Sequence, residues 1–284
     1  MRMTARGGGH LLTPGQLVNA VAIALDVPEE TVVQHDRNLV VSGLRTKGGR
    51  GHSAATVTPL DAARLIIAVI GSFRVRDSVS TVKEFESAMF VPPNTLAAVQ
   101  AAHRAEGDFE DPDFVLHDAE AENIRNLPIL RLSEKHNFVE AVAELIAGAS
   151  APVERDQLDQ YLRLYAGLHI VCQAPDIFGW IGRIEPESSH SALIYEPASR
   201  SLSAALRRED KPRWPASDDR YLRYLTLQGI YQNRSFHGSA ILLLGRAFRK
   251  NGLPFKTTQE AIADLSQGGA GKTNKKKLAI KRAK

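Results

Sequence analysis

The sequence predicts a mainly α-helical protein with α+β character. Three observations support this fold class. Amphipathic helical patterns follow one another closely between Thr13 and Gly71, another such pattern begins at Asn137, and short β-branched and aromatic runs separated by Pro, Gly and Ser follow Gly167. Apolar residues at helical spacing indicate helices, whereas short runs between turn residues indicate strands of an antiparallel sheet.

Composition excludes several classes of protein. The 284 residues are 43% hydrophobic and 24% charged, as in ordinary globular chains, and the length favours two domains. The longest apolar runs, 65–70 and 240–244, are far shorter than a membrane span, and no secretory signal is visible after the basic, Gly-rich start. With Cys172 as the one cysteine, neither an intrachain disulfide nor a multi-thiolate metal site is expected, which favours a reducing cytoplasm.

The net charge of +4 depends on the last residues of the chain. Residues 272–284 hold seven basic groups and no acid, so the remainder carries −3. The basic character is therefore mostly a property of this tail. We expect the tail to be disordered and to add sequence-independent attraction to DNA, through Lys275, Lys276, Lys277, Lys281 and Arg282. A tail that only promotes solubility is the alternative.

Two helices joined by a very short turn are predicted at the N-terminus. Thr13 and Pro14 form a helix-start signal, and Leu17, Val21 and Leu25 share one helical face. Asp26 and Val27 leave room only for a turn before Pro28, which is followed by Glu29 and Glu30 in the first turn of the next helix. Helices joined so briefly must cross, as in a helix-turn-helix.

The second helix has an apolar and a polar side. The apolar side consists of Val32, Val33, Leu39 and Val40. The polar side consists of Thr31, Gln34, His35, Asn38 and Ser42, with Arg37 at its edge. Amide side chains can pair with adenine, and Arg with guanine or phosphate. Asp36 falls on the apolar side, so we expect a hydrogen bond or an ion pair there, with Arg45 or Arg64 as partner.

A basic glycine-rich turn follows this helix. Leu44 is predicted to begin a strand, the run Lys47-Gly48-Gly49-Arg50-Gly51-His52 to form a tight turn, and residues 54–57 to return as a second strand before Thr58 to Asp61 open a third helix. This order resembles a winged helix-turn-helix DNA-binding domain. The sequence pattern is most similar to the N-terminal domains of MerR-type and phage-type transcriptional regulators. The resemblance covers about a fifth of the chain.

The resemblance implies a docking geometry. The second helix would enter the major groove and present Thr31, Gln34, His35, Arg37 and Asn38, while Lys47, Arg50 and His52 would lie on the wing. The cysteine constellation and the long coiled coil of MerR-type sensors are missing, so a metal-sensing activator is not expected. We expect no cofactor and no metal site.

The chain is expected to divide into four parts. These are a winged helix-turn-helix at 13–72, a helical and acidic linker at 73–122, a mixed α+β domain at 123–265 and a basic disordered tail at 266–284. Within the mixed domain we expect helices from Phe138 to Gly148, from near Pro152 through Tyr165, and over 218–231 and 239–249. The acidic residues 106–122 lack the spacing of a calcium loop, although metal binding is an alternative for them.

No catalytic set emerges from the sequence. A Gly-Lys-Thr ends at Thr273, but a phosphate-binding loop would need glycine where Ser266 stands. His169 and Cys172 would lie on opposite faces of a strand, which argues against shared metal ligation. Aromatic and basic residues interleave over 213–250, where packing is favoured over stacking on single-stranded bases. We therefore expect no enzymatic activity.

The expected function is sequence-specific binding of double-stranded DNA by a transcriptional regulator in the cytoplasm, associated with the nucleoid. We expect a homodimer, because paired domains match paired half-sites, with the transcription machinery as a further partner and no membrane partner. Two alternatives stay open. One is a phage-type protein that marks packaging or replication-initiation sites; the other is a protein-interaction adaptor that binds no DNA.

Overall fold

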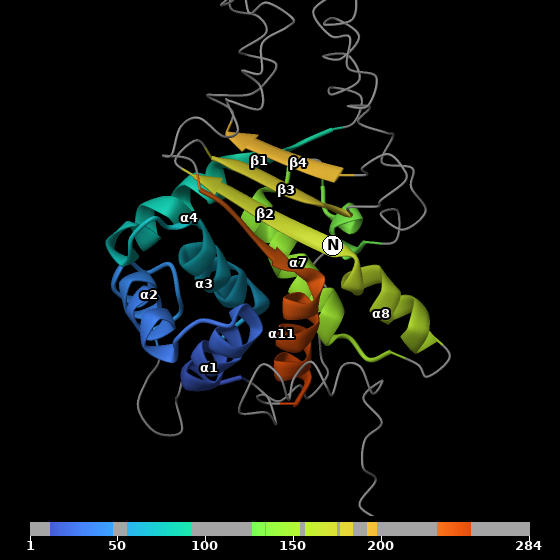
Figure 1. Cartoon of the computed structure of the whole chain (residues 1–284), viewed down its shortest axis with the longest axis horizontal. Coiled ribbons are helices and arrows are strands. Elements are labelled where there is room, and N and C mark those ends of the chain that lie inside the picture. The colour runs from blue at the N-terminus through green and yellow to red at the C-terminus, as the bar shows by residue number, and fades with distance from the viewer. Residues whose placement is uncertain are drawn as a thin grey trace, which may run out of the picture.

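The computed structural model describes residues 12–47, 56–92, 127–133, 135–153, 157–174, 177–183, 192–197 and 232–250. Helices and a five-stranded antiparallel sheet form two layers (Figure 1). The mixed α+β character predicted from the sequence is thus confirmed. No helix within the described ranges has the length and apolarity needed to cross a membrane.

The N-terminal part is helical. It contains α1 (Pro14–Leu25), α2 (Glu29–Val41), α3 (Pro59–Gly71), the short 3-10 helix η2 (Val75–Asp77) and α4 (Ser78–Ser87). Thr13 and Gln16 form a capping box at the start of α1, as Thr58 and Asp61 do for α3. Asp26 ends α1 in the left-handed conformation with φ 53°, which turns the chain sharply into α2.

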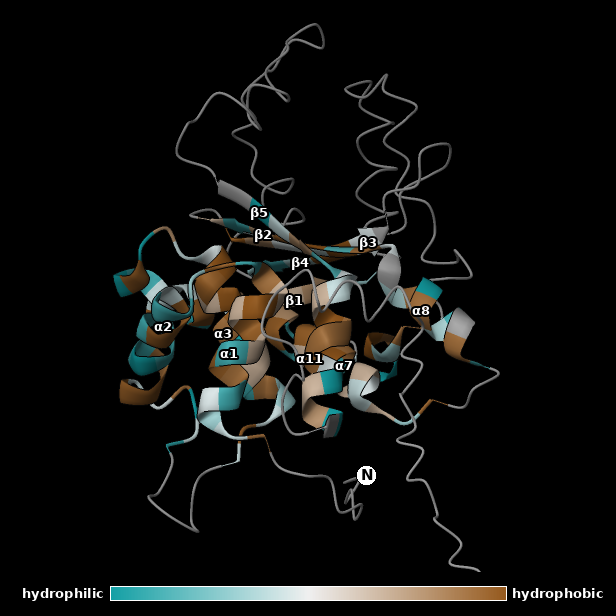
Figure 2. Cartoon of the chain, turned by 60° about the horizontal axis from the view of Figure 1, so that its bottom comes forward, coloured by the Kyte–Doolittle hydropathy of each residue, from teal (hydrophilic) through white to brown (hydrophobic). Residues whose placement is uncertain are grey.

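The remaining elements build the sheet and the helices beneath it. The strands are β1 (Ala88–Val91), β2 (Leu168–Ala174), β3 (Phe178–Arg183), β4 (Ala192–Pro197) and β5 (Gln232–His237), in the order β1-β4-β3-β2-β5. The helices are η3 (Pro128–Arg131), α7 (Phe138–Ser150), α8 (Leu158–Ala166) and α11 (Gly238–Lys250). Figure 2 shows the apolar helices α3, α7 and α11 together beneath the strands.

The core is continuous across the predicted domain boundaries. One cluster of buried side chains includes Leu17 of α1, Ile66 of α3, Phe85 of α4, Leu145 of α7 and Ile241 of α11. Helix α3 packs on α7, and α1 packs on α11. The N-terminal helices therefore share their core with the part of the chain that was predicted as a separate domain.

Residues 73–92 correct one prediction. They were expected to belong to a helical linker, and α4 is indeed helical, but Val82 and Phe85 of α4 are fully buried and β1 is an edge strand of the sheet. Solvated linkers do not carry such side chains. The acidic stretch 106–122, the predicted helix 218–231 and the tail 266–284 lie outside the described residues.

Several predicted elements are found close to their predicted bounds, and others differ. Helices α7 and α11 agree to within two residues, and strands follow Gly167 as expected. The predicted strand at Leu44 is wrong, because residues 42–47 form turns, bends and coil. Strands β1 and β5 were not predicted, since neither has a clear alternation between turn residues.

Helices α7 and α11 approach each other closely at Gly245. A β-carbon at this position would overlap the backbone and the side chain of Ala149 on α7. Overpacking of this kind shifts helices or strains rotamers. The contact thus requires glycine at position 245.

We predict that Gly245→Ala lowers the free energy of unfolding by about 1 to 3 kcal/mol. Gly15→Ala on α1 is the matched control, because no atom lies within 4 Å of its added β-carbon. That change is expected to be neutral or to stabilise by up to about 1 kcal/mol through helix propensity. Urea unfolding of both variants measures the difference, and equal midpoints would contradict the packing argument.

Candidate nucleic-acid interface

Helix α2 holds most of the side chains predicted to contact DNA, and the structure separates them into two groups. Gln34 and Arg37 are exposed, and Thr31 is half-buried. His35 is only 4% exposed, and the Asn38 amide Nδ2 donates to the carbonyl of Val75 at 2.8 Å. His35 and Asn38 therefore do not lie on the exposed side of α2, which corrects the sequence prediction for both.

The segment that covers them consists of η2 and the start of α4. Nδ1 of His35 lies 2.8 Å from the hydroxyl of Ser78, and that hydroxyl donates to the carbonyl of Val75. A serine hydroxyl has one proton, so His35 donates from Nδ1 to Ser78 in its neutral form. One edge of the polar side of α2, formed by His35 and Asn38, thus hydrogen-bonds to residues 75–78. From the sequence alone, these two residues cannot be distinguished from exposed polar residues.

The exposed line of α2 consists of Glu30, Gln34, Arg37 and Val41, at helical spacing. Val41 is 89% exposed, which is high for a branched apolar side chain. Glu29 and Glu30 place negative charge at the N-terminal end of this line, and Arg37 places positive charge toward its C-terminal end. Sequence reasoning missed Glu30 and Val41, which the same helical spacing from Gln34 would have found.

A buried ion pair holds α2 against the chain that follows it. Arg45 Nη2 donates to Asp36 at 2.8 Å, and Arg45 Nε forms a second contact with the same carboxylate. Burial raises the pKa of Asp36, and the hydrogen bond and charge of Arg45 act in the opposite direction. The prediction that Arg45 or Arg64 pairs with Asp36 is confirmed for Arg45.

Arg64 has different partners. It donates to the carbonyl of Leu44 at 2.7 Å and to Glu86 at 2.8 Å. The residues that leave α2 are therefore bound to α2 through Arg45 and to α3 through Arg64.

One carboxylate binds the residues on either side of the segment 47–57. Asp61 accepts hydrogen bonds from the backbone N–H of Thr46 at 3.1 Å and of Thr58 at 2.8 Å, and it is only 3% exposed. Val57 also donates to the carbonyl of Leu12 at 3.1 Å. The segment from Lys47 to Val57 consequently begins and ends at the N-terminus of α3. Lys47 is exposed, whereas Arg50 and His52 lie outside the described residues, so their predicted place on a wing stays a prediction.

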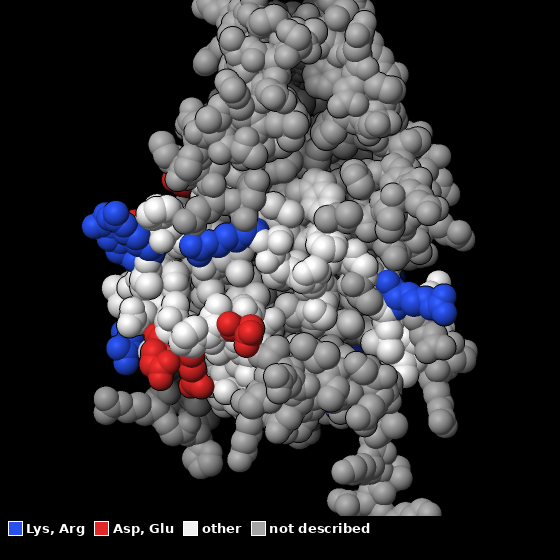
Figure 3. All heavy atoms as spheres, viewed as in Figure 1, with Lys and Arg blue, Asp and Glu red and all other residues white. Residues whose placement is uncertain are grey.

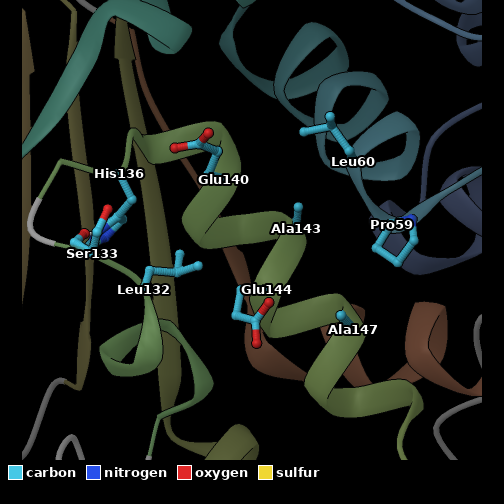
Figure 4. Close-up of a pocket in the computed structure, with 9 residues that line it drawn as sticks. All are labelled: Pro59, Leu60, Leu132, Ser133, His136, Glu140, Ala143, Glu144 and Ala147. Carbon is cyan, nitrogen blue, oxygen red and sulfur yellow. The ribbon is translucent and has the colours of Figure 1, made fainter. Parts of the chain in front are cut away.

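A shallow hollow of about 330 Å³ lies between α3 and α7 (Figure 4). Pro59 and Leu60 form one side, and Glu140 and Glu144 line it from α7. Glu140 accepts from the backbone N–H of Asn137 at 2.9 Å, so it serves as part of a helix cap. Burial raises the pKa of Glu144, against the nearby charge of Arg131.

The histidine beside this hollow has a hydrogen-bonding partner at each ring nitrogen. Nδ1 of His136 lies 2.6 Å from the carbonyl of Ser133, and Nε2 lies 3.0 Å from the hydroxyl of Tyr195. A carbonyl only accepts, so Nδ1 donates to Ser133. Within the described ranges, no group of three or more His, Cys, Asp or Glu side chains could hold a metal ion.

We predict that acid weakens the fold through His35. Burial, with a further contribution from the charge of Arg234, lowers the pKa of His35 from 6.5 to about 4. The unfolded chain binds the proton more readily, so this contribution to stability is complete above pH 6.5 and is lost as the pH falls toward 4. The loss is on the order of 3 kcal/mol. Thermal unfolding between pH 7 and 4 should show a shallower decline for His35→Gln, and equal slopes would contradict this assignment.

We also predict that Arg45→Ala lowers the free energy of unfolding by roughly 3 to 5 kcal/mol, because the buried Asp36 carboxylate loses its partner. Arg76→Ala is the control: Arg76 lies 3.6 Å from Asp77 and is 73% exposed. Its loss should cost less than about 1 kcal/mol. Denaturant midpoints of the two variants test the prediction, and similar values would show that the buried pair has no special weight.

The chain matches no family model, no curated protein and no solved structure. Its similarity to winged helix-turn-helix proteins stays a resemblance at the level of sequence pattern. A function for this chain must therefore be argued from its own residues and their geometry.

Proposed function

We propose that the N-terminal region binds double-stranded DNA in a sequence-specific way, through the exposed line of α2 and the basic segment between Lys47 and Val57. The observation that carries the proposal is the Asp61 carboxylate, which holds both ends of that segment beside α3. Through Arg45 and Asp36, the same chain is also fixed to α2. A polar helix and a basic loop anchored to each other can contact one duplex together.

The dimensions and chemistry of α2 support this docking. Its 13 residues extend over about 20 Å, and a helix fits the major groove, which is about 12 Å wide. Gln34 can pair bidentately with adenine and Arg37 with guanine or phosphate. Of the α2 residues predicted from the sequence to contact bases, the proposal keeps Thr31, Gln34 and Arg37. His35 and Asn38 instead hold the helix in place from inside.

Charge limits how strongly the described surface alone can bind. Figure 3 shows Lys and Arg side chains of the described residues in small separate groups, with acidic side chains nearby. Glu29 and Glu30 would repel phosphates at one end of α2. Strong binding therefore needs further cations, for which we propose Arg50, the Lys-rich tail and a second copy of the chain.

Within this proposal the protein acts as a transcriptional regulator. The phage-type alternative, marking of a packaging or replication-initiation site, uses the same contacts and differs only in the locus bound. Sites selected from the source genome that lie upstream of promoters favour regulation. Sites at a packaging or origin locus favour the alternative.

Arg37→Ala tests the proposal most directly. The full chain is titrated against the fragment that it selects from genomic DNA, in the presence of nonspecific competitor. We expect Arg37→Ala to weaken specific binding by about 1 to 3 kcal/mol, because a bidentate or phosphate contact is lost. Arg50→Ala should weaken binding to all sequences and reduce its salt dependence.

The matched control is Arg163→Ala, an exposed arginine on α8, which lies on the other side of the molecule from α2 in Figure 1. It should bind as the parent chain does. If Arg37→Ala and Arg50→Ala both bind like this control, or if no fragment outcompetes nonspecific DNA, the proposal fails and the adaptor alternative is preferred.

A further inference from the structure

Two histidines face each other across the edge of the sheet. His169 of β2 is directly opposite His237, the last residue of the edge strand β5. Their ring centroids are 4.4 Å apart, and the rings meet edge to face at 66°. Neither residue belongs to the proposed DNA interface, so this pair has no role in the function proposed above.

The pair lies on the face of the sheet that is turned away from the helices. Leu168, Ile170 and Cys172 alternate with His169 along β2 and are buried in the core. Because side chains of a strand alternate between faces, His169 points to the opposite side. His169 is half-buried and His237 is exposed, so an ion from solvent can reach them.

We infer that His169 and His237 form a two-histidine site for a transition-metal ion such as Zn²⁺, Ni²⁺ or Cu²⁺. Imidazole nitrogen is a ligand of choice for these ions, whereas Mg²⁺ and Ca²⁺ prefer oxygen. Both rings must be neutral and must aim a nitrogen at one point. The χ2 torsion of histidine is broad, so the exposed ring of His237 can turn from its edge-to-face position to do this.

The surroundings of His169 favour the neutral form of its ring, which is the form that binds a metal. Burial lowers the pKa of His169, and the neighbouring His237 lowers it further. Among the described residues, no third His, Cys, Asp or Glu completes a larger ligand group. As far as the described residues go, the other coordination positions are open to water or to a ligand from solution.

A purely structural role is the competing explanation. Cross-strand aromatic pairs stabilise sheet edges by about 0.2 to 1 kcal/mol, and a packed pair of imidazole rings would do no more than that. The two explanations differ for His237→Phe, which keeps a ring against His169 but removes the nitrogen ligand. This variant should keep the sheet edge and lose the metal.

Trp180 provides a local reporter. It lies on β3 opposite Val171, and both Val171 and His169 are on the outer face of β2. The chain has two tryptophans, so Trp214→Phe leaves Trp180 as the one emitter. Cu²⁺ bound at the histidine pair should quench it.

The experiment titrates the full chain carrying Trp214→Phe with CuCl₂ and records tryptophan fluorescence and the Cu²⁺ EPR spectrum. We expect saturation at one ion per chain, an EPR pattern from two imidazole nitrogens, and displacement by Zn²⁺. His169→Asn, His237→Asn and His237→Phe should each weaken binding at least tenfold. His103→Asn, a histidine elsewhere in the sequence, should leave binding unchanged.

Retention of parental affinity by His237→Phe or His237→Asn would overturn the inference, as would an EPR spectrum with a single nitrogen ligand. Circular dichroism establishes that each variant is folded. Should His169→Asn unfold, the exposed His237 still decides the outcome, because both of its variants change only a solvent-facing side chain.

Discussion

Burial of helix α3 is the constraint on which the rest of the structure depends. Of its 13 residues, nine are buried, including Leu65, Ile66 and Ile67 on adjacent positions of the helix. A helix that is apolar all round is stable only when other elements enclose it. It is in contact with α1, α2, α4, α7 and two strands of the sheet. The N-terminal helices are therefore not an appendage, because α3 belongs to their core and to that of the sheet at the same time.

The polar residues at the start of α3 connect this buried helix to the chain on either side of the segment 47–57. Asp61 is buried beside Thr46 and Thr58, and Arg64 bonds to the carbonyl of Leu44. Burying any of these polar groups without its partner would cost free energy. The residues just before and just after the segment 47–57 are therefore held in fixed positions. A segment whose two ends are already fixed loses less entropy on binding a ligand than one with free ends. The proposed role in DNA binding benefits directly from this arrangement.

The sequence predicts local features well and long-range contacts poorly. The helix starts at Thr13 and Thr58 are predictable because in each case a threonine stands directly before a proline, which is a local start signal. The sequence also offers Arg45 or Arg64 as partner of Asp36, because a buried carboxylate needs a cation or a hydrogen bond. His35 and Asn38 were misplaced for a different reason. Their partners, Val75 and Ser78, come about 40 positions later in the chain. Helical periodicity distinguishes a polar face from an apolar one, but it does not show whether another polar segment covers that face.

The same limit explains what was missed in the sheet. Strand β5 contains His237, Arg234 and Ser235, a pattern with little β-branched character, and it pairs with β2 through backbone groups that any sequence provides. The register of this pairing alone decides which side chains face each other. It brings His237 opposite His169, although 68 positions separate them in the sequence. Arg234, on the other face, reaches the carbonyl of Ser72 and lies close enough to His35 to disfavour its charged form. Arg234 of the edge strand β5 thus bonds to the chain that follows α3 and acts electrostatically on His35 of α2. Residues from the second half of the chain therefore belong to the surroundings of the proposed DNA-binding helix.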